Sequence, residues 1–336
     1  MKKSFALILF TFITCIFCQS CHLGGNRTWA NDHIDESVRT EIHALNKKLF
    51  QAFMAKDAAS GKQLMSPALL AQTGAKIDTI ISAVGESFQA ADYDVIDEYY
   101  TKNTTTGINV VLPSNKGNNN DYTLTYTALN KEMYASLLAP KDLSVNCMIL
   151  AIYGKYDDGW KINILHVGEY TILGKAAPDY YAEALKLYDK GSIIDAANTM
   201  FMAAELRAPG DKYLTYKVET QMQAFYNKML DEANTKYKFP VSLTRVKTAP
   251  KVFAISPQFL GEDQYKGVYP IIKYQSAINL ADTVALKVEN NAIQKVIGDT
   301  FKGIDEDKAY VVYQAFNQIP DGKTPAKHYG FIEKLK

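Results

Sequence analysis

Apolar residues recur every three or four positions after residue 33, which is the spacing of one face of an α-helix. The first stripe consists of Ile34, Val38, Ile42, Leu45, Leu49 and Phe53. The second consists of Ile77, Ile80, Ile81, Val84 and Phe88. Asp32 stands where the first helix would be capped, and Gly61 and Pro67 interrupt the pattern between the stripes. The spacing therefore predicts two amphipathic helices near the start of the folded chain.

From Tyr93 onward apolar and polar residues tend to alternate, which is the pattern of half-buried strands. The expected strands cover residues 93–100, 108–112, 122–128, 145–153 and 160–170. The segment 145–153 is apolar on both faces and is expected to be a central strand. Asp157-Asp158-Gly159 is a hairpin signal that joins it to the last strand. Helices followed by these strands predict an α+β domain with an antiparallel sheet.

This order of elements, ending in Gly159-Trp160-Lys161-Ile162, resembles the nuclear transport factor 2-like superfamily, which includes the polyketide-cyclase-like (SnoaL-like) proteins. The resemblance covers about residues 33–173. It implies a cone in which a curved antiparallel sheet packs on the N-terminal helices and leaves a pocket at its wide end. Some members of that superfamily use the pocket as an active site, and many bind only a ligand or a partner.

The composition changes to helix-forming residues near Ala176, and Pro178 suits the first turn of a helix. The following segment resembles a single tetratricopeptide repeat, although Glu183 replaces its usual leucine. The matching residues are Tyr180, Ala184, Tyr188, Gly191, Asp195, Ala196, Ala203 and Pro209. A third helix is expected to cover the open face of this pair, with a stripe of Leu214, Val218, Met222, Phe225 and Met229. The helical module is thus placed at residues 176–236.

Phe239-Pro240 ends the helical stretch, and residues 239–336 are expected to form a second α+β domain. Strands are predicted over 268–274, 283–288 and 310–316, with Asp321-Gly322 in a final hairpin. One helix is predicted to carry Ile293, Val296, Ile297, Phe301 and Ile304. We recognise no family in this part of the chain.

The N-terminus has the features of an export signal. Lys2 and Lys3 precede an apolar run over residues 5–17, which is shorter than the ~20 residues that span a bilayer. Ser20-Cys21 then resembles the processing site of a bacterial lipoprotein, although Cys18 stands where an aliphatic residue is usual. The resemblance implies a signal peptide at 1–20, a lipid anchor at Cys21 and a tether at 21–32. His22 is not the aspartate of an inner-membrane retention signal, which favours the outer membrane.

The cysteines allow two other interpretations. Cys15, Cys18 and Cys21 have a CxxCxxC spacing, but an iron–sulfur cluster is disfavoured because the first two lie in or against the signal sequence. Cys18 to His22 also spells the CxxCH motif of haem c attachment, which processing before Cys21 would cut in half. A Soret band in the mature protein would favour haem over lipidation. After processing only Cys147 is left as a thiol, so no intramolecular disulfide can form.

Composition excludes several classes of function. The 336 residues include 37 Lys and Arg against 36 Asp and Glu, a net charge of +1 that provides no field for nucleic acid. No HExxH, P-loop, GxGxxG or supported GxSxG motif occurs, which removes the common zinc proteases, nucleotide enzymes and serine hydrolases. We therefore expect no nucleic-acid partner, no cofactor and no metal.

His166 is the main candidate for acid–base chemistry, because alternation places it on one face with Trp160, Ile162 and Ile164. Asp94 or Asp97 would orient it, and alternation places these two on opposite faces. The alternative is that His166 is a structural residue bonded to backbone. A cation site is one interpretation of the cluster Asp92, Asp94, Asp97 and Glu98, but its spacing fits no known calcium loop and a solvated acidic edge is preferred.

Aromatic residues suggest where a ligand would lie. The chain has 22 tyrosines, with pairs at Tyr99-Tyr100 and Tyr180-Tyr181, and exposed aromatic rings can stack on sugars. Most are expected in the core or in strands. The expected ligand contacts are Trp160, Ile164, Tyr99 and Tyr100.

Two functions follow from the sequence. The first is a membrane-anchored lipoprotein that binds a protein, peptide or small ligand without catalysis. The second is a small-molecule cyclase, isomerase or dehydratase with His166 and one aspartate in an open pocket of the first domain. The second requires that pocket to be deep and partly polar.

Overall fold

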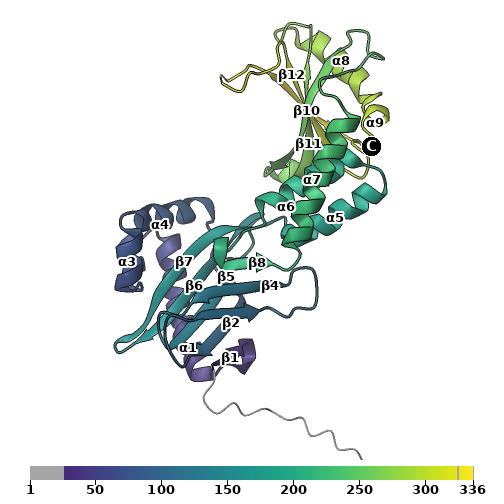
Figure 1. Ribbon diagram of the computed structural model, residues 1–336. Coiled ribbons are helices and arrows are strands. Elements are labelled where there is room, and N and C mark those ends of the chain that lie inside the picture. The colour runs from purple at the N-terminus through teal and green to yellow at the C-terminus, as the bar shows by residue number, and fades with distance from the viewer. Residues whose placement is uncertain (1–25, 324, 336) are drawn as a thin grey trace, which may run out of the picture.

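The computed structural model describes residues 26–323 and 325–335. It has the expected α+β architecture, and Figure 1 shows a first domain, a helical part in the middle and a C-terminal domain at the far end. The expected signal peptide and Cys21 lie outside the described residues. The elements of the first domain are α1 (Glu36–Met54), α2 (Ala58–Gln63), α3 (Pro67–Thr73), α4 (Lys76–Ser87), β1 (Arg27–Ala30), β2 (Tyr93–Lys102), β3 (Asn109–Pro113), β4 (Tyr122–Thr127), β5 (Glu132–Pro140), β6 (Val145–Tyr156) and β7 (Gly159–Ile172).

The two predicted N-terminal helices are confirmed as α1 and α4. The expected cap was wrong, because the side chain of Asp35 accepts a hydrogen bond from the Ser37 backbone N–H. Asp32 instead forms an ion pair with Arg39 at 2.7 Å. The short helices α2 and α3 fill the interval between the two stripes and were not predicted.

The main sheet has the order β1-β2-β5-β6-β7, with antiparallel neighbours throughout. The hairpin at Asp157-Asp158-Gly159 is confirmed between β6 and β7. Two strands differ from the sequence predictions. Residues 27–30 of the expected tether form β1, and β5 was missed although it lies at the centre of the sheet. Because β5 is buried along nearly its whole length, its residues do not alternate in polarity.

One face of the sheet packs against α1 to α4, and large side chains fill the space between them. Phe53, Ile42 and Leu49 from α1 are fully buried against Tyr134 of β5 and Tyr153 of β6. The polar groups inside are also paired, since Tyr153 donates a hydrogen bond to Asn46 at 2.8 Å and Asn46 donates one to Ser136 at 3.0 Å. The space between α1 to α4 and this face of the sheet is therefore a packed core.

The opposite face is covered by residues from two parts of the chain. β3 and β4 form a second sheet with β8 (Leu214–Tyr216), which follows the helical pair α5 (Ala177–Asp189) and α6 (Ile193–Glu205). Leu214 was expected on the third helix, but it pairs with Leu124 of β4, and the third helix α7 begins later (Glu219–Lys236). The first domain and the helical module consequently share one hydrophobic core.

The C-terminal domain is a sheet covered by a crossover helix. Its elements are β9 (Val241–Ser242), β10 (Lys251–Leu260), β11 (Gly267–Gln275), α8 (Thr283–Gln294), α9 (Ile297–Thr300), β12 (Tyr310–Phe316) and β13 (Tyr329–Lys334). The order is β13-β12-β11-β10-β9, and β11 and β12 are parallel, which requires a crossover. The strand predicted at 283–288 was wrong, because Asp282 caps α8 at that point. The predicted helix carrying Ile293 to Ile304 is split between the end of α8, α9 and the turn after it.

Helix α8 buries an unpaired carboxylate against the sheet. Glu289 is 3% exposed, and neither of its carboxylate oxygens has a hydrogen-bond partner among the described residues. The hydroxyls of Tyr274 and Tyr313 are also buried and unpaired within those residues. Glu289 therefore costs free energy that an apolar side chain of similar size would not.

We predict that Glu289→Met raises the free energy of unfolding by about 1–3 kcal/mol, because it removes a buried polar group without a partner. Urea unfolding at pH 7 measures the change. Glu205→Met is the control, because Glu205 is an exposed helical residue and its replacement should change little. A loss of stability in Glu289→Met would contradict the prediction.

Candidate functional site

A β-bulge separates His166 from the residues expected beside it. Tyr153 pairs with Ile162 and Ile152 pairs with Ile164, so Asn163 is an extra residue in β7. The bulge reverses the alternation: Trp160 faces α1 to α4, whereas Ile164 faces the second sheet. His166 pairs with Leu150 and faces the same way as Ile164. The prediction that His166 shares a face with Trp160 was therefore wrong.

The expected acid–base group is not assembled. Asp97, Leu137, Leu150 and His166 form one row across β2, β5, β6 and β7. Three strand spacings amount to about 14 Å, and two buried leucines lie between Asp97 and His166. Burial lowers the pKa of His166, and Asp211 beside the end of α6 partly opposes this. This environment suits the structural role that the sequence left open for His166.

Asp94 and Asp97 also differ from expectation. A bulge between Val95 and Asp97 pairs Asp94 with Ala139 and Asp97 with Leu137, which places both aspartates on one face. Asp94 is exposed and lies 3.4 Å from Lys141. Asp97 and Glu98 are buried, so the run from Asp92 to Glu98 is only partly a solvated edge.

Two of the four expected ligand contacts come together. The rings of Tyr100 and Trp160 lie 6.1 Å apart, and both contact Tyr134. Tyr99 and Ile164 lie on the other face of the sheet. Because Tyr100 and Trp160 are each less than a tenth exposed, this group is part of the core and offers no open surface to a sugar.

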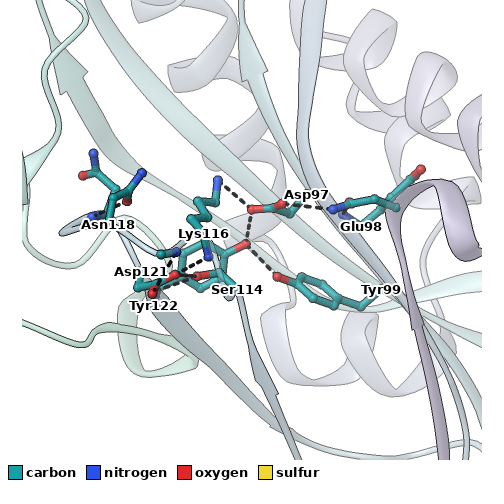
Figure 2. A network of polar contacts seen from close by, with 11 residues as sticks. Asp97, Glu98, Tyr99, Ser114, Lys116, Asn118, Asp121 and Tyr122 are labelled. Atoms are coloured by element: carbon teal, nitrogen blue, oxygen red, sulfur yellow. Dashed lines mark hydrogen bonds and ion pairs between the residues drawn. The ribbon is translucent and has the colours of Figure 1, made fainter. Parts of the chain in front are cut away.

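Asp97 is the centre of a polar network on the second face of the sheet (Figure 2). Tyr122 donates a hydrogen bond to its carboxylate at 2.6 Å, and the Lys116 ammonium lies 2.8 Å from the same oxygen. The hydroxyls of Tyr99 and Tyr122 form a hydrogen bond with each other at 3.2 Å. Burial and the charge of Asp97 raise the pKa of Tyr122. The network holds the loop between β3 and β4 against β2.

Asp121 holds the other end of this loop. Its carboxylate accepts hydrogen bonds from Ser114 at 2.8 Å and from Lys217 at 3.0 Å. Burial alone would raise the pKa of Asp121, but these hydrogen bonds lower it to about 2. Lys217 directly follows β8, so the ion pair links the first domain to the segment between α6 and α7. The Asp97 and Asp121 contacts are well paired and suit a structural role.

Removing the central carboxylate should weaken the first domain. Asp97→Ala leaves Lys116 and Tyr122 without their acceptor, and we expect a loss of about 2–4 kcal/mol in the free energy of unfolding. Asp94→Ala, on the exposed part of the same strand, should change it by less than about 0.5 kcal/mol. Equal urea midpoints for the two variants would contradict the structural role of the network.

A second buried carboxylate, that of Glu98, is paired on the side of the main sheet that faces α1. Glu98 accepts a hydrogen bond from Tyr134 at 2.6 Å, and His43 lies 2.8 Å from it. His43 was not predicted from the sequence, because it is not part of the apolar stripe of α1. Within residues 26–323 and 325–335, no three His, Cys, Asp or Glu side chains gather where they could hold a metal ion.

An amphipathic cleft of about 450 Å³ lies where α5 and α6 meet the C-terminal domain. One wall is a stripe of α6 at helical spacing, formed by Asp195, Asn198, Thr199 and Met202. Helix α5 contributes Tyr180, Glu183 and Leu187, and Lys190 caps its C-terminal end. The facing wall comes from β10, β11 and the turn before β12, with Pro257, Gly267, Val268, Tyr269, Pro270, Gly303, Glu306, Asp307, Lys308 and Ala309.

A buried ion pair joins the two walls. Lys308 lies 2.7 Å from Asp195, and it also donates hydrogen bonds to the carbonyls of Gly303 at 2.7 Å and Glu306 at 2.8 Å. Burial raises the pKa of Asp195 to about 6, although Lys308 opposes the shift. Gly303 has a φ of 87°, and a Cβ there would lie 2.2 Å from the Ser192 hydroxyl. The turn is thus fixed tightly to the start of α6.

This cleft was not predicted from the sequence. In the sequence, Asp195 was singled out only as part of the tetratricopeptide resemblance, and Lys308 lies in a domain without a recognised family. The residues that meet are more than a hundred positions apart, and no local pattern connects them. Their spacing in sequence carries no signal of contact.

Comparisons with protein-family models, curated proteins and solved structures return no match for this chain. In the part of the chain that the structure describes, no helix combines the length and hydropathy needed to cross a bilayer.

Proposed function

We propose that the protein is an exported, lipid-anchored, non-catalytic binding module whose ligand occupies the cleft between α5, α6 and the C-terminal domain. The cleft carries this proposal: its volume is within the ~300–1,000 Å³ of small-molecule sites. Such sites also prefer junctions between domains. The walls combine apolar side chains with a few fixed polar groups, as binding pockets do.

The alternative enzyme in the first domain has less support. Its histidine and aspartate lie about 14 Å apart across the sheet, beyond the reach of a hydrogen bond. Side chains also fill the space between the main sheet and the second sheet, which is the side that His166 faces. Catalysis at His166 would require both features to change.

Anchoring at Cys21 is the second part of the proposal. In cells fed radioactive palmitate, we expect the wild-type chain to be labelled and to sediment with membranes. Cys21→Ser should lose the label and leave the membrane fraction, because only a cysteine thiol can carry the thioether-linked lipid. Cys18→Ser is the matched control and should stay labelled. Equal labelling of all three would contradict anchoring at Cys21.

Photo-crosslinking tests occupation of the cleft in cells. The photoreactive residue p-benzoylphenylalanine would replace Glu306 at the exposed rim of the cleft or, as a control, Val111 on β3, which is 60% exposed. We expect irradiation to add a small-molecule mass at position 306 and none at 111, measured on the intact protein. An unmodified mass at position 306, or equal adducts at both positions, would contradict the proposal.

A further inference from the structure

The charges of the cleft are neutralised within the protein. Lys175 is paired with Glu183, Lys190 with Asp307 at 3.0 Å, and Lys308 with Asp195. Lys308 has no donor to spare, because its three hydrogens are directed to Asp195 and two backbone carbonyls. Glu306 is exposed at the rim. Among the described residues that line the cleft, none therefore presents a free cation or anion to its interior.

A charged ligand would fit this environment poorly. To enter, its charge would lose hydration and would either stay unpaired or break one of the existing ion pairs. Breaking the pair of Asp195 and Lys308 would leave a buried charge without a partner, because both side chains are mostly shielded from solvent. The pairs thus select against ionic groups of either sign.

The rest of the cleft lining favours a ligand with an apolar body and one hydrogen-bond acceptor. Leu187, Met202, Pro257 and Val268 supply apolar walls. Asn198 lies among them, and its amide nitrogen is shielded from solvent without a hydrogen-bond partner among the described residues. The χ2 torsion of asparagine is broad, so this amide can turn toward a ligand at little cost. An oxygen acceptor in the cleft would satisfy it.

We propose that the cleft takes an uncharged, largely apolar molecule whose carbonyl, ether or hydroxyl oxygen accepts a hydrogen bond from Asn198. This inference rests on the proposed function and narrows it to one class of ligand. The ion pairs exclude charged competitors, and the single amide orients the ligand.

Three fluorescent naphthalene probes test the inference on the full chain. Prodan is neutral and has a ketone, N-phenyl-1-naphthylamine is neutral without a carbonyl, and 8-anilinonaphthalene-1-sulfonate adds an anionic group to the second ring system. We expect both neutral probes to bind and the sulfonate to bind at least tenfold more weakly. Thr199→Trp, which fills the cleft, should abolish binding of the neutral probes.

Asn198→Leu tests the hydrogen bond. It should weaken Prodan about fivefold or more and leave N-phenyl-1-naphthylamine unchanged. Urea midpoints check that each variant is folded. If Asn198→Leu does not fold, the wild-type protein still tests the hydrogen bond, because it should bind Prodan, which has a ketone acceptor, more tightly than N-phenyl-1-naphthylamine. Sulfonate binding as tight as that of the neutral probes, or no Thr199-dependent binding by any probe, would overturn the inference. Crosslinking at position 306 decides separately whether the cleft is occupied.

Discussion

Lys308→Met is expected to lower the free energy of unfolding by about 3–5 kcal/mol at pH 7. The variant leaves the Asp195 carboxylate buried without its cation, which lies 2.7 Å away in the native protein. It also frees two backbone carbonyls of the turn before β12, those of Gly303 and Glu306. The turn loses these internal hydrogen bonds together with the contact to Asp195 of α6. Urea unfolding followed by circular dichroism measures the loss.

The stability loss in Lys308→Met should also depend on pH. Burial raises the pKa of Asp195 to about 6 in the folded protein, above its ordinary value of 3.8. A raised carboxyl pKa means that the folded state holds the proton more tightly than the unfolded state. Its contribution to stability is therefore complete below pH ~4 and is lost as the pH rises through about 6. The loss of unfolding free energy in Lys308→Met, relative to the wild type, should therefore be smaller at pH 5 than at pH 7.

Two further variants separate the ion pair from the lysine itself. Lys295→Met removes an exposed lysine of the same domain and should change stability by less than about 0.5 kcal/mol. Asp195→Leu combined with Lys308→Met removes both charges and should recover much of the loss. If Lys308→Met behaved like Lys295→Met at every pH, the pair would not hold the cleft together.

A chain ended after Gly174 should fail to fold cooperatively. The truncation removes α5, α6 and β8, which cover the second face of the main sheet. It would expose Leu124, Leu137 and Leu150, which are fully buried in the complete protein. A chain ended after Lys238 keeps this cover and is the matched control.

Urea unfolding and near-ultraviolet circular dichroism distinguish the two chains. We expect a sharp transition and ordered aromatic signals from the longer chain, and a broad transition without those signals from the shorter one. Cooperative unfolding of the chain ended at Gly174, with the same midpoint as the longer chain, would show that the first domain has a core of its own.

Hydrophobic spacing predicted the elements with a clear period. The stripes of α1 and α4 and the strands β6 and β7 were confirmed because each has one buried face or a strong turn signal. Strand β5 was missed since it is buried on both sides and shows no alternation. Segment 283–288 carries β-branched residues typical of strands, but the cap at Asp282 and the parallel crossover make it helical.

The faces of the strands were harder to predict than the strands themselves. One extra residue at Asn163 and another near Ile96 each reverse the alternation that follows. These two bulges explain why His166 and Trp160 lie on opposite faces of the sheet and why Asp94 and Asp97 lie on the same face. The cleft could not be predicted either, because its walls come from helices at 177–205 and from strands and turns at 251–309 that only the tertiary fold brings together.

Methyl NMR tests the place of binding most directly. The chain has nine methionines, among them Met202 on the wall of the cleft and Met65 in the core between the helices and the main sheet. With 13C-labelled methionine methyls and added Prodan, we predict a shift of the Met202 signal and an unchanged Met65 signal. A shift of Met65 with Met202 unchanged would place the ligand inside the first domain and contradict the assignment of the cleft.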